Sequence, residues 1–243
     1  LRDRGPGAGA GAALAVLGPT LRRWDRRAAA TAHRYVVNSR EVRRRVADLY
    51  GIEAEVVPPP VAIDDAGDAD PPDGLSAGYV LCVSRLLPYK NVEAVIDAFG
   101  RMPDRQLVVV GSGPLFEELS DAAPHNVVLL GTVSDASLRW LYRHSVGLVA
   151  ASYEDFGLTP LEAATFGRPT AALRFGGFLD TVVEDETGVF FDEPEPHRIG
   201  QAVERLCRTD WDAVAIQAHA GRFSVDRFRT RMDALVTEER GRV

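Results

Sequence analysis

The chain has 243 residues, of which 46% are hydrophobic and 26% charged, and its formal net charge is −7. This length can bury one sizeable core, or one domain and part of another. No apolar run approaches the ~20 residues that a membrane-spanning helix needs, and an acidic chain without interleaved aromatic and basic residues argues against nucleic acid as a partner. Cys82 and Cys207 lie far apart, so we expect reduced thiols in a cytoplasmic protein rather than a disulfide.

Positive charge gathers at the start, where residues 1–60 hold 11 Arg against 6 acids. The arginine-rich residues 40–45 could attract anionic lipid headgroups and attach the protein peripherally to the inner face of a membrane. However, Val42, Val46 and Leu49 follow the i, i+4, i+7 spacing of an amphipathic helix. A solvated helix face is therefore the favoured interpretation.

The first sixty residues predict too few elements for a complete domain. We expect a loop in the Gly/Ala-rich residues 5–15, a helix over about residues 20–32, a short strand in RYVVN and a helix capped by Ser39. The prolines at 58–60 can continue neither a helix nor a central strand, so they mark a boundary. One strand and two helices cannot bury their own apolar faces, and residues 1–60 are expected to be the tail of a domain whose beginning is missing.

Strands and helices alternate regularly from Tyr79 onward. The helices are predicted from Asn91, in PLFEELSDA, in DASLRWLYRH and over 160–166, where Gly167 and Pro169 end the helix. The predicted strands are YVLCVSR, QLVVVG, NVVLLG, VGLVAA, TAALRF and GVFF. This alternation indicates an α/β fold with a Rossmann-like, doubly wound parallel sheet covered on both faces. Further helices finish the chain, the last capped by Ser224.

Glycine or charged residues follow five of these strands. In a doubly wound sheet ligands bind at the carboxyl ends of the strands, and glycines there let backbone N–H groups approach oxyanions. The sequence therefore predicts a site for a phosphorylated ligand. The segments are Ser84-Arg85, Gly111-Ser112-Gly113, Gly131-Thr132-Val133, Ser152-Tyr153-Glu154 and Gly176-Gly177.

The segment SRLLPYKN places Arg85 and Lys90 on either side of a proline-bearing loop. Arginine offers a planar fork that suits phosphate, and lysine a compact charge. Lys90 is also the only lysine in the chain, which favours a function over a chance residue at a solvated helix start.

The segment EDFGLTPLE holds Glu154 and, eight positions later, Glu162. Thr159 and Glu162 form the T-x-x-E pattern of a capping box, so Glu162 could serve as a helix cap, a role compatible with ligand binding. For Glu154 the sequence offers no structural role, and we predict that it projects toward the ligand.

Together the motifs SRLLPYKN, VVGSGP, GTVSD, EDFGLTPLEAATFGRP and GG(x)₄V resemble the donor-binding domain of glycosyltransferase family 4, which has the GT-B fold. The resemblance runs from about Arg22 to Phe228 and is specific as an ensemble. RRWDRRAAATAHRYVVNSREV and the EDFG variant are most similar to GDP-mannose-type mannosyltransferases of polysaccharide assembly. One departure is Asp180, where family members often carry glutamate after the glycine pair.

The resemblance implies roles for particular residues. Arg85 and Lys90 would hold the donor diphosphate and stabilise the departing nucleoside diphosphate, while Glu154 would bind sugar hydroxyls and Glu162 the ribose. The rest of the implied donor-binding set is Gly111, Gly113, Val133 beside the base, and the backbone of Phe156, Gly157, Leu158 and Thr159.

The resemblance also implies a retaining transfer of a sugar, mannose from GDP-mannose, to a glycan or lipid-linked acceptor. No Asp-x-Asp motif lies in the matching region, so neither a metal nor another cofactor is expected. The implied division is 1–60 for part of an N-terminal acceptor domain, 61–224 for the donor domain and 225–243 for a helix that crosses back. Val225, Phe228 and Leu235 on that helix would then lack a full partner surface, and we expect the chain alone to bind donor without transferring sugar.

Other functions remain open. A nucleotide-sugar-binding module without catalysis, or another GT-B enzyme such as a sugar-phosphate synthase or an epimerase, would carry similar motifs. An NAD-dependent oxidoreductase is disfavoured because its first strand should be followed by G-x-G-x-x-G, whereas SRLLPYK follows here and GSGPLF lacks the third glycine.

Overall fold

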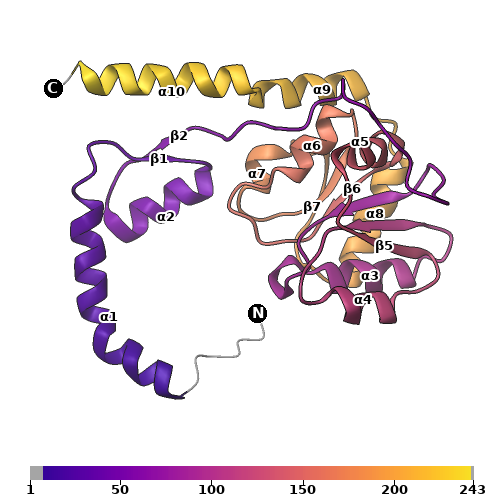
Figure 1. Cartoon of the computed structure of the whole chain (residues 1–243), viewed down its shortest axis with the longest axis horizontal. Helices are drawn as coiled ribbons and strands as arrows, with labels where there is room; N and C mark the ends of the chain where they lie inside the picture. Colours follow the sequence, from indigo (N-terminus) through magenta and orange to yellow (C-terminus); the bar gives the residue numbers. More distant parts are fainter. Residues whose placement is uncertain (1–7, 242–243) are drawn as a thin grey trace.

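A computed structural model of the protein describes residues 8–241. Within them, six parallel strands form one sheet in the order β5-β4-β3-β6-β7-β8 (Figure 1). The strands are β3 (Val80–Val83), β4 (Leu107–Val110), β5 (Val127–Gly131), β6 (Gly147–Ala150), β7 (Thr170–Leu173) and β8 (Gly188–Phe191). The predicted doubly wound α/β fold is confirmed.

Helices cover both faces of this sheet, which explains why its strands are apolar along their whole length. Helix α3 packs against α8, and α6 packs against α9. Every residue of β4, β6 and β7 is buried. The helices are η1 (Pro88–Lys90), α3 (Val92–Gly100), α4 (Phe116–Ala122), α5 (Asp135–His144), α6 (Thr159–Thr165), α7 (Phe178–Thr181), α8 (Pro196–Arg208), α9 (Ala213–Ala220) and η2 (Gly221–Phe223).

The N-terminal segment consists of α1 (Ala8–Ala29), β1 (Val36–Val37), α2 (Arg40–Tyr50) and β2 (Glu55–Val56), and β1 pairs with β2 in parallel. Two predictions are wrong here: residues 8–15 are helical rather than a loop, and the helix starts well before residue 20. The many alanines of this stretch favour a helix enough to outweigh its glycines. Residues 5–7 of the predicted loop lie outside the described part of the chain. The Ser39 cap is confirmed, since its Oγ accepts from the Val42 N–H at 3.1 Å.

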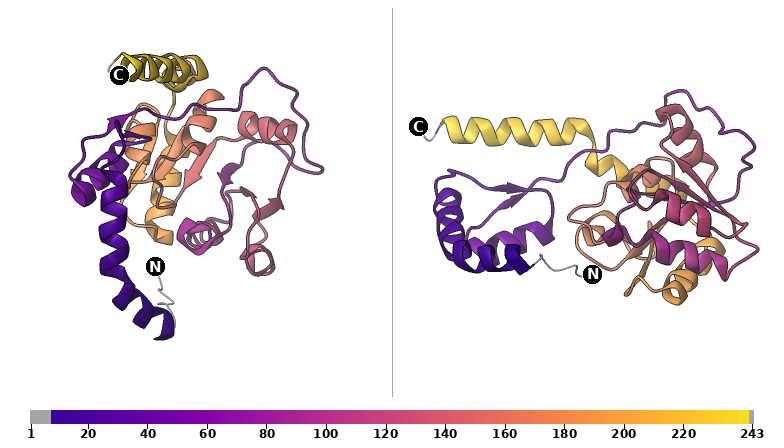
Figure 2. Two further views of the ribbon diagram at one scale, coloured as in Figure 1. Left: turned by 60° about the vertical axis from the view of Figure 1, so that its left-hand side comes forward. Right: turned by 60° about the horizontal axis from the view of Figure 1, so that its bottom comes forward.

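Helix α10 (Val225–Arg240) leaves the sheet domain and runs back along the N-terminal segment, capped as predicted by Ser224 (Figures 1 and 2). Arg34 joins Glu55 and Glu238 at 2.6 Å each, which ties β2 to α10. Leu235 is only 4% exposed, so the prediction that it lacks a partner surface is wrong. It lies with Arg34 and Val36 around a shared hollow, because the N-terminal segment covers this face of α10.

Three smaller expectations concern single residues and spans. Helix α6 ends at Thr165, one residue before the predicted end, and Gly167 comes after its C-cap residue Phe166 with φ +67°. Cys82 is buried and Cys207 half-buried, and both are free. Among residues 8–241 no helix has the length and apolar character needed to cross a membrane. The domain boundaries after residues 60 and 224 stay predictions.

The loop after β4 packs directly on the loop after β3. Gly111 has φ +134°, and a Cβ atom at this position would overlap the carbonyl oxygen of Ser84. The Gly111 N–H also donates to Gly131 O at 2.8 Å, which draws the end of β5 to the same place. The three strand ends are therefore held together by a position that only glycine fits.

We expect Gly111→Ala to lower the free energy of unfolding by about 2 kcal/mol or more, because the new methyl group clashes with backbone and the φ value is strained. Urea unfolding monitored by circular dichroism measures this change. Gly51 has φ +68° with no atom within 4 Å of an added Cβ, so Gly51→Ala should cost only about 1 kcal/mol. Gly221 has φ −58° and open space, and Gly221→Ala should be neutral or slightly stabilising. Equal losses at Gly111 and Gly51 would contradict the close-packing argument.

Candidate donor-binding site

A cavity of about 650 Å³ lies at the carboxyl ends of β3, β4 and β6. Strand β3 stands between β4 and β6, so the chain winds away from this point in opposite directions. Such a topological switch point is where doubly wound sheets bind ligands, because two neighbouring loops diverge there. Here the two loops are residues 84–91 after β3 and residues 151–158 after β6.

Asn91 fixes the first loop to the second. Pro88 starts the short helix η1, and Asn91 ends it in the left-handed conformation with φ 55°. From there the Asn91 Nδ2 group donates to Ala151 O at 2.7 Å. This hydrogen bond sets the position of Lys90, which immediately precedes it.

Lys90 and Glu154 form an ion pair between these two loops, and both residues line the cavity at the switch point. Their side chains are 13% and 25% exposed, so the pair is screened less than a surface pair. Ser152 Oγ donates to the same carboxylate oxygen, Glu154 Oε1, at 2.9 Å. Glu154 thus has structural partners that the sequence did not indicate, and it still lines the cavity as predicted.

Glu162 does not act as a helix cap. Helix α6 begins at Thr159 itself, its N-cap residue Leu158 makes no side-chain cap hydrogen bond, and the predicted capping box is therefore wrong. Instead, the Tyr142 hydroxyl on α5 donates to Glu162 Oε2 at 2.7 Å. Burial raises the pKa of the Glu162 carboxyl, and the hydrogen bond from Tyr142 partly offsets this rise.

The structure brings together every predicted site residue except Gly113. Arg85 is exposed at the rim, and no described side chain forms an ion pair with it. Gly113 does not line the cavity; an added Cβ there would overlap Leu86 O, so this glycine serves the packing of the loop. The predicted residues that line the cavity are Arg85, Lys90, Gly111, Val133, Glu154, Phe156, Gly157, Leu158, Thr159 and Glu162.

The glycine pair after β7 supports the loop that carries Glu154. The Gly177 N–H donates to Glu154 O at 2.9 Å, and a Cβ atom on Gly177 would overlap the Phe156 backbone. A Cβ atom on Gly176 would overlap Glu154 O. The sequence predicted these glycines to face a ligand, whereas in the structure they buttress the loop.

The N-terminal segment closes one side of the cavity through Asn38, together with Pro59 shortly after β2, and the sequence indicated neither contact. Two contacts hold it there. The Arg40 N–H at the start of α2 donates to Asp180 Oδ2 at 2.7 Å, and the Arg40 guanidinium pairs with the same carboxylate. Arg45 pairs with Asp155. Asp180 therefore bridges to the N-terminal segment, a contact between residues 140 positions apart that no local pattern could reveal.

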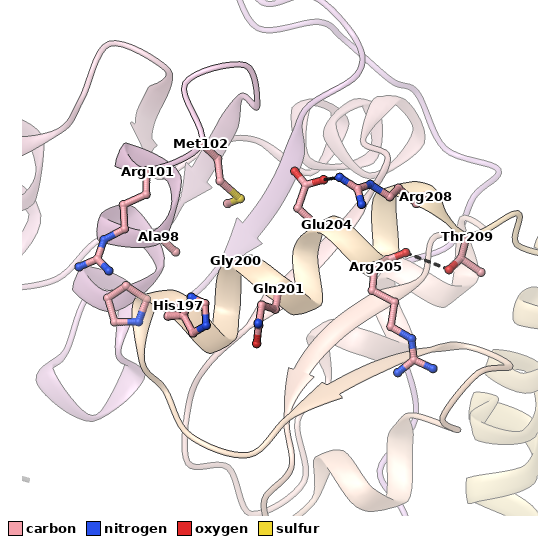
Figure 3. Close-up of a pocket in the computed structure, with 11 residues that line it drawn as sticks. Ala98, Arg101, Met102, His197, Gly200, Gln201, Glu204, Arg205, Arg208 and Thr209 are labelled. Carbon is pink, nitrogen blue, oxygen red and sulfur yellow. Dashed lines mark hydrogen bonds and ion pairs between the residues drawn. The ribbon is translucent and has the colours of Figure 1, made fainter.

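A second hollow, of about 680 Å³, lies between α3 and α8, away from the strand ends (Figure 3). Its basic side chains are largely occupied with carboxylates: Arg208 pairs with Glu204 at 2.9 Å, and Arg205 pairs with Asp185. Figure 3 shows the Arg205 side chain directed away from Glu204 and Arg208. This hollow lacks the converging charges of the switch-point cavity, which remains the candidate site.

The sequence pattern of the family described as "Glycosyl transferases group 1" matches residues 74–220, more than half of the chain and all of the switch-point loops. The chain belongs to this family. The resemblance to GT-B glycosyltransferases inferred from the motifs is thereby confirmed.

The relatives of this chain differ in the acceptor that their names give. The GDP-mannose-dependent alpha-(1-6)-phosphatidylinositol monomannoside mannosyltransferase of Mycolicibacterium smegmatis is 30% identical, over 92% of this chain and 72% of its own length. The D-inositol 3-phosphate glycosyltransferase of Acidothermus cellulolyticus is 31% identical, over 81% of this chain and 51% of its own. The chain thus spans only part of the relatives it matches.

Solved structures agree on the fold. Sucrose-phosphate synthase from Thermosynechococcus elongatus superimposes with a TM-score of 0.76 at 20% identity, over 93% of this chain and 63% of its own. Anabaena HepE in complex with UDP and glucose gives a TM-score of 0.72 at 20% identity, over 85% and 63%. These likenesses establish the architecture alone.

The buried Glu162 makes a prediction about stability and pH. A carboxyl whose pKa is raised in the folded state disfavours folding wherever it must be ionised, that is, above its raised pKa. Glu162→Gln should therefore raise the melting temperature at pH 7. The gain should shrink as the pH falls through the raised pKa and vanish below about pH 4, where the carboxyl is neutral in both states.

Glu204 provides a control of opposite sign. Arg105 lowers the pKa of the Glu204 carboxyl, so Glu204→Gln should lower the melting temperature at pH 7, with the loss disappearing as the pH falls. Differential scanning fluorimetry between about pH 4 and pH 8 compares both variants with the wild type. A Glu162→Gln protein that is less stable than wild type at pH 7 would show that burial of this charge is not the dominant effect.

Proposed function

We propose that this protein transfers a sugar from a nucleotide-sugar donor to a glycan or lipid-linked acceptor, and that the switch-point cavity binds the donor. The observation that carries the proposal is the convergence of Arg85, Lys90 and Glu154 on one cavity where the winding of the sheet reverses. Cations and a carboxylate in one such cleft suit a ligand that combines an anionic group with hydroxyl groups.

The two cations are proposed to bind the donor diphosphate. Arg85 offers a planar fork at the rim, and Lys90 a point charge further inside. Lys90 already faces an anion, the Glu154 carboxylate, so its ammonium group is oriented into the site before any ligand arrives. The backbone of residues 156–159 lines the same space and would share the contacts to phosphate.

The carboxylates are proposed to recognise hydroxyl groups. Glu162 would accept from the ribose of the nucleotide and Glu154 from the sugar, with Val133 beside the base. A donor diphosphate that engages Lys90 would leave Glu154 free to turn toward the sugar.

The proposed reaction breaks the bond between the anomeric carbon and the diphosphate oxygen, whose electron pair stays on the leaving group. Arg85 and Lys90 stabilise the charge that develops there, which lowers the barrier. The acceptor hydroxyl then attacks the oxocarbenium-like sugar from the face that the leaving group vacates and gives its proton to the departing diphosphate oxygen, so that the configuration is retained. We propose that these two cations neutralise the diphosphate without a metal ion or another cofactor.

GDP-mannose is the proposed donor, and the GDP-mannose-dependent mannosyltransferase among the relatives supports this choice. The HepE complex with UDP and glucose makes a uridine nucleotide the specific alternative. Because the chain spans only part of its relatives, we propose donor binding for the 243-residue chain and assign acceptor binding to the portion of the relatives that it does not span. A lipid-linked acceptor would place the reaction at the cytoplasmic face of a membrane.

Calorimetric titration of the chain with GDP, UDP and ADP tests the site. We expect GDP to bind most tightly and Lys90→Ala to weaken its binding by roughly 10- to 100-fold, the worth of a hydrogen bond to a charged group. Arg101→Ala is the matched control, since it removes one positive charge from the α3–α8 hollow instead. Equal affinity for GDP in wild type and Lys90→Ala would refute the assignment, and tighter binding of UDP would change the proposed donor.

Glu154→Gln distinguishes the contacts to the donor diphosphate from the contacts to the donor sugar. Removing its negative charge releases Lys90 and lessens repulsion of the diphosphate, so GDP should bind as tightly as to wild type or up to about tenfold more tightly. Any preference of the wild type for GDP-mannose over GDP, measured as a ratio of affinities, should disappear in this variant, because the carboxylate that accepts from the sugar is gone. If GDP-mannose keeps its full advantage, Glu154 does not contact the sugar.

A further inference from the structure

Tyr142 on α5 is fully buried, yet it ends in a polar group that points at the edge of the donor cavity. Its side chain is 0% exposed, and its ring stacks on Phe166 with centroids 5.4 Å apart and planes 7° from parallel. Only the hydroxyl reaches a charged group, Glu162 Oε2, at 2.7 Å. A buried aromatic side chain that only filled space would need no hydroxyl group.

This hydrogen bond constrains Glu162 in a particular way. Burial keeps the Tyr142 phenol protonated, so it donates and the carboxylate accepts. The bond takes Oε2, and among the described residues no other side chain donates to Glu162, which lines the cavity. One carboxylate oxygen is therefore anchored to α5 while the other stays available to a ligand.

We infer that Tyr142 is a positioning residue for nucleotide recognition: it fixes the Glu162 carboxylate so that the second oxygen accepts from the ribose hydroxyls. The inference rests on the proposed function, in which Glu162 contacts the ribose. It adds that the orientation of this contact is set from α5, which precedes β6, and not from α6. A held carboxylate loses less rotamer freedom when the ligand binds than an unrestrained one, and this difference appears as affinity.

The test compares GDP with 2′,3′-dideoxy-GDP, which has no ribose hydroxyls, by calorimetric titration of the full chain. Wild type should prefer GDP. In Tyr142→Phe, which keeps the stacked ring and removes only the hydroxyl, this preference should fall about fivefold to tenfold while the affinity for dideoxy-GDP stays the same. In a Glu162→Gln background, Tyr142→Phe should change the preference by less than about twofold, because the two residues act through one contact.

Tyr79 supplies the matched control. It is also 0% exposed, and its hydroxyl donates to Leu141 O on the same helix at 2.9 Å. Tyr79→Phe removes the same group from the same region and should leave the preference for GDP unchanged. If Tyr142→Phe fails to fold, Phe166→Leu loosens the stacked tyrosine without touching the carboxylate and should lower the preference about twofold to threefold.

The outcomes separate the two proposals. If wild type binds neither GDP nor the other nucleoside diphosphates, the proposed function fails and this inference falls with it. If GDP binds but Tyr142→Phe weakens both ligands alike, or Tyr79→Phe lowers the preference equally, the tyrosine is structural only, and the proposed function stands without the inference. Loss of the preference confined to Tyr142→Phe supports it.

Discussion

The ion pair between Lys90 and Glu154 is a direct link between the two sides of the candidate site. It joins the two loops that leave the sheet in opposite directions from β3 and β6. Without such a link, the divergence that opens the cavity would also leave its two sides independent of each other. The hydrogen bond from Asn91 to Ala151 O reinforces the same connection one residue away. The order of the strands therefore opens the cavity, and the ion pair links its two sides.

Glycines make this arrangement stiff rather than adaptable. Gly111 rests on Ser84 O, and Gly177 rests on the Phe156 backbone, so each ligand-facing loop lies against the backbone of a neighbouring loop. Backbone contacts of this kind have no rotamers to exchange, and interiors packed this closely transmit displacements instead of absorbing them. Part of what resembles a phosphate cradle in the sequence is therefore a scaffold for the side chains that meet the ligand.

The sequence revealed the sheet and most of the site because both depend on local patterns. Continuous apolar runs located the strands, and the order of the strand ends placed Lys90 and Glu154 on one edge. Pairings across the fold were not predictable: Glu162 turned to Tyr142 instead of capping its own helix, since the hydroxyl that attracts it lies on α5. Leu235 was misjudged for the same reason, because its cover comes from a segment some two hundred residues earlier.

The ion pairs that hold the N-terminal segment to the sheet domain differ from the Lys90–Glu154 pair in how exposed their side chains are. Asp180 is only 10% exposed where it pairs with Arg40, whereas Arg45 and Asp155 are 43% and 60% exposed, and an ion pair exposed on both sides contributes about 0–1 kcal/mol. Lys90 and Glu154 are far less exposed, so water screens their attraction much less. The wall of the cavity formed by Asn38 and Pro59 is therefore held mainly through the contact between Arg40 and Asp180, while the floor formed by the switch-point loops is held by the Lys90–Glu154 pair.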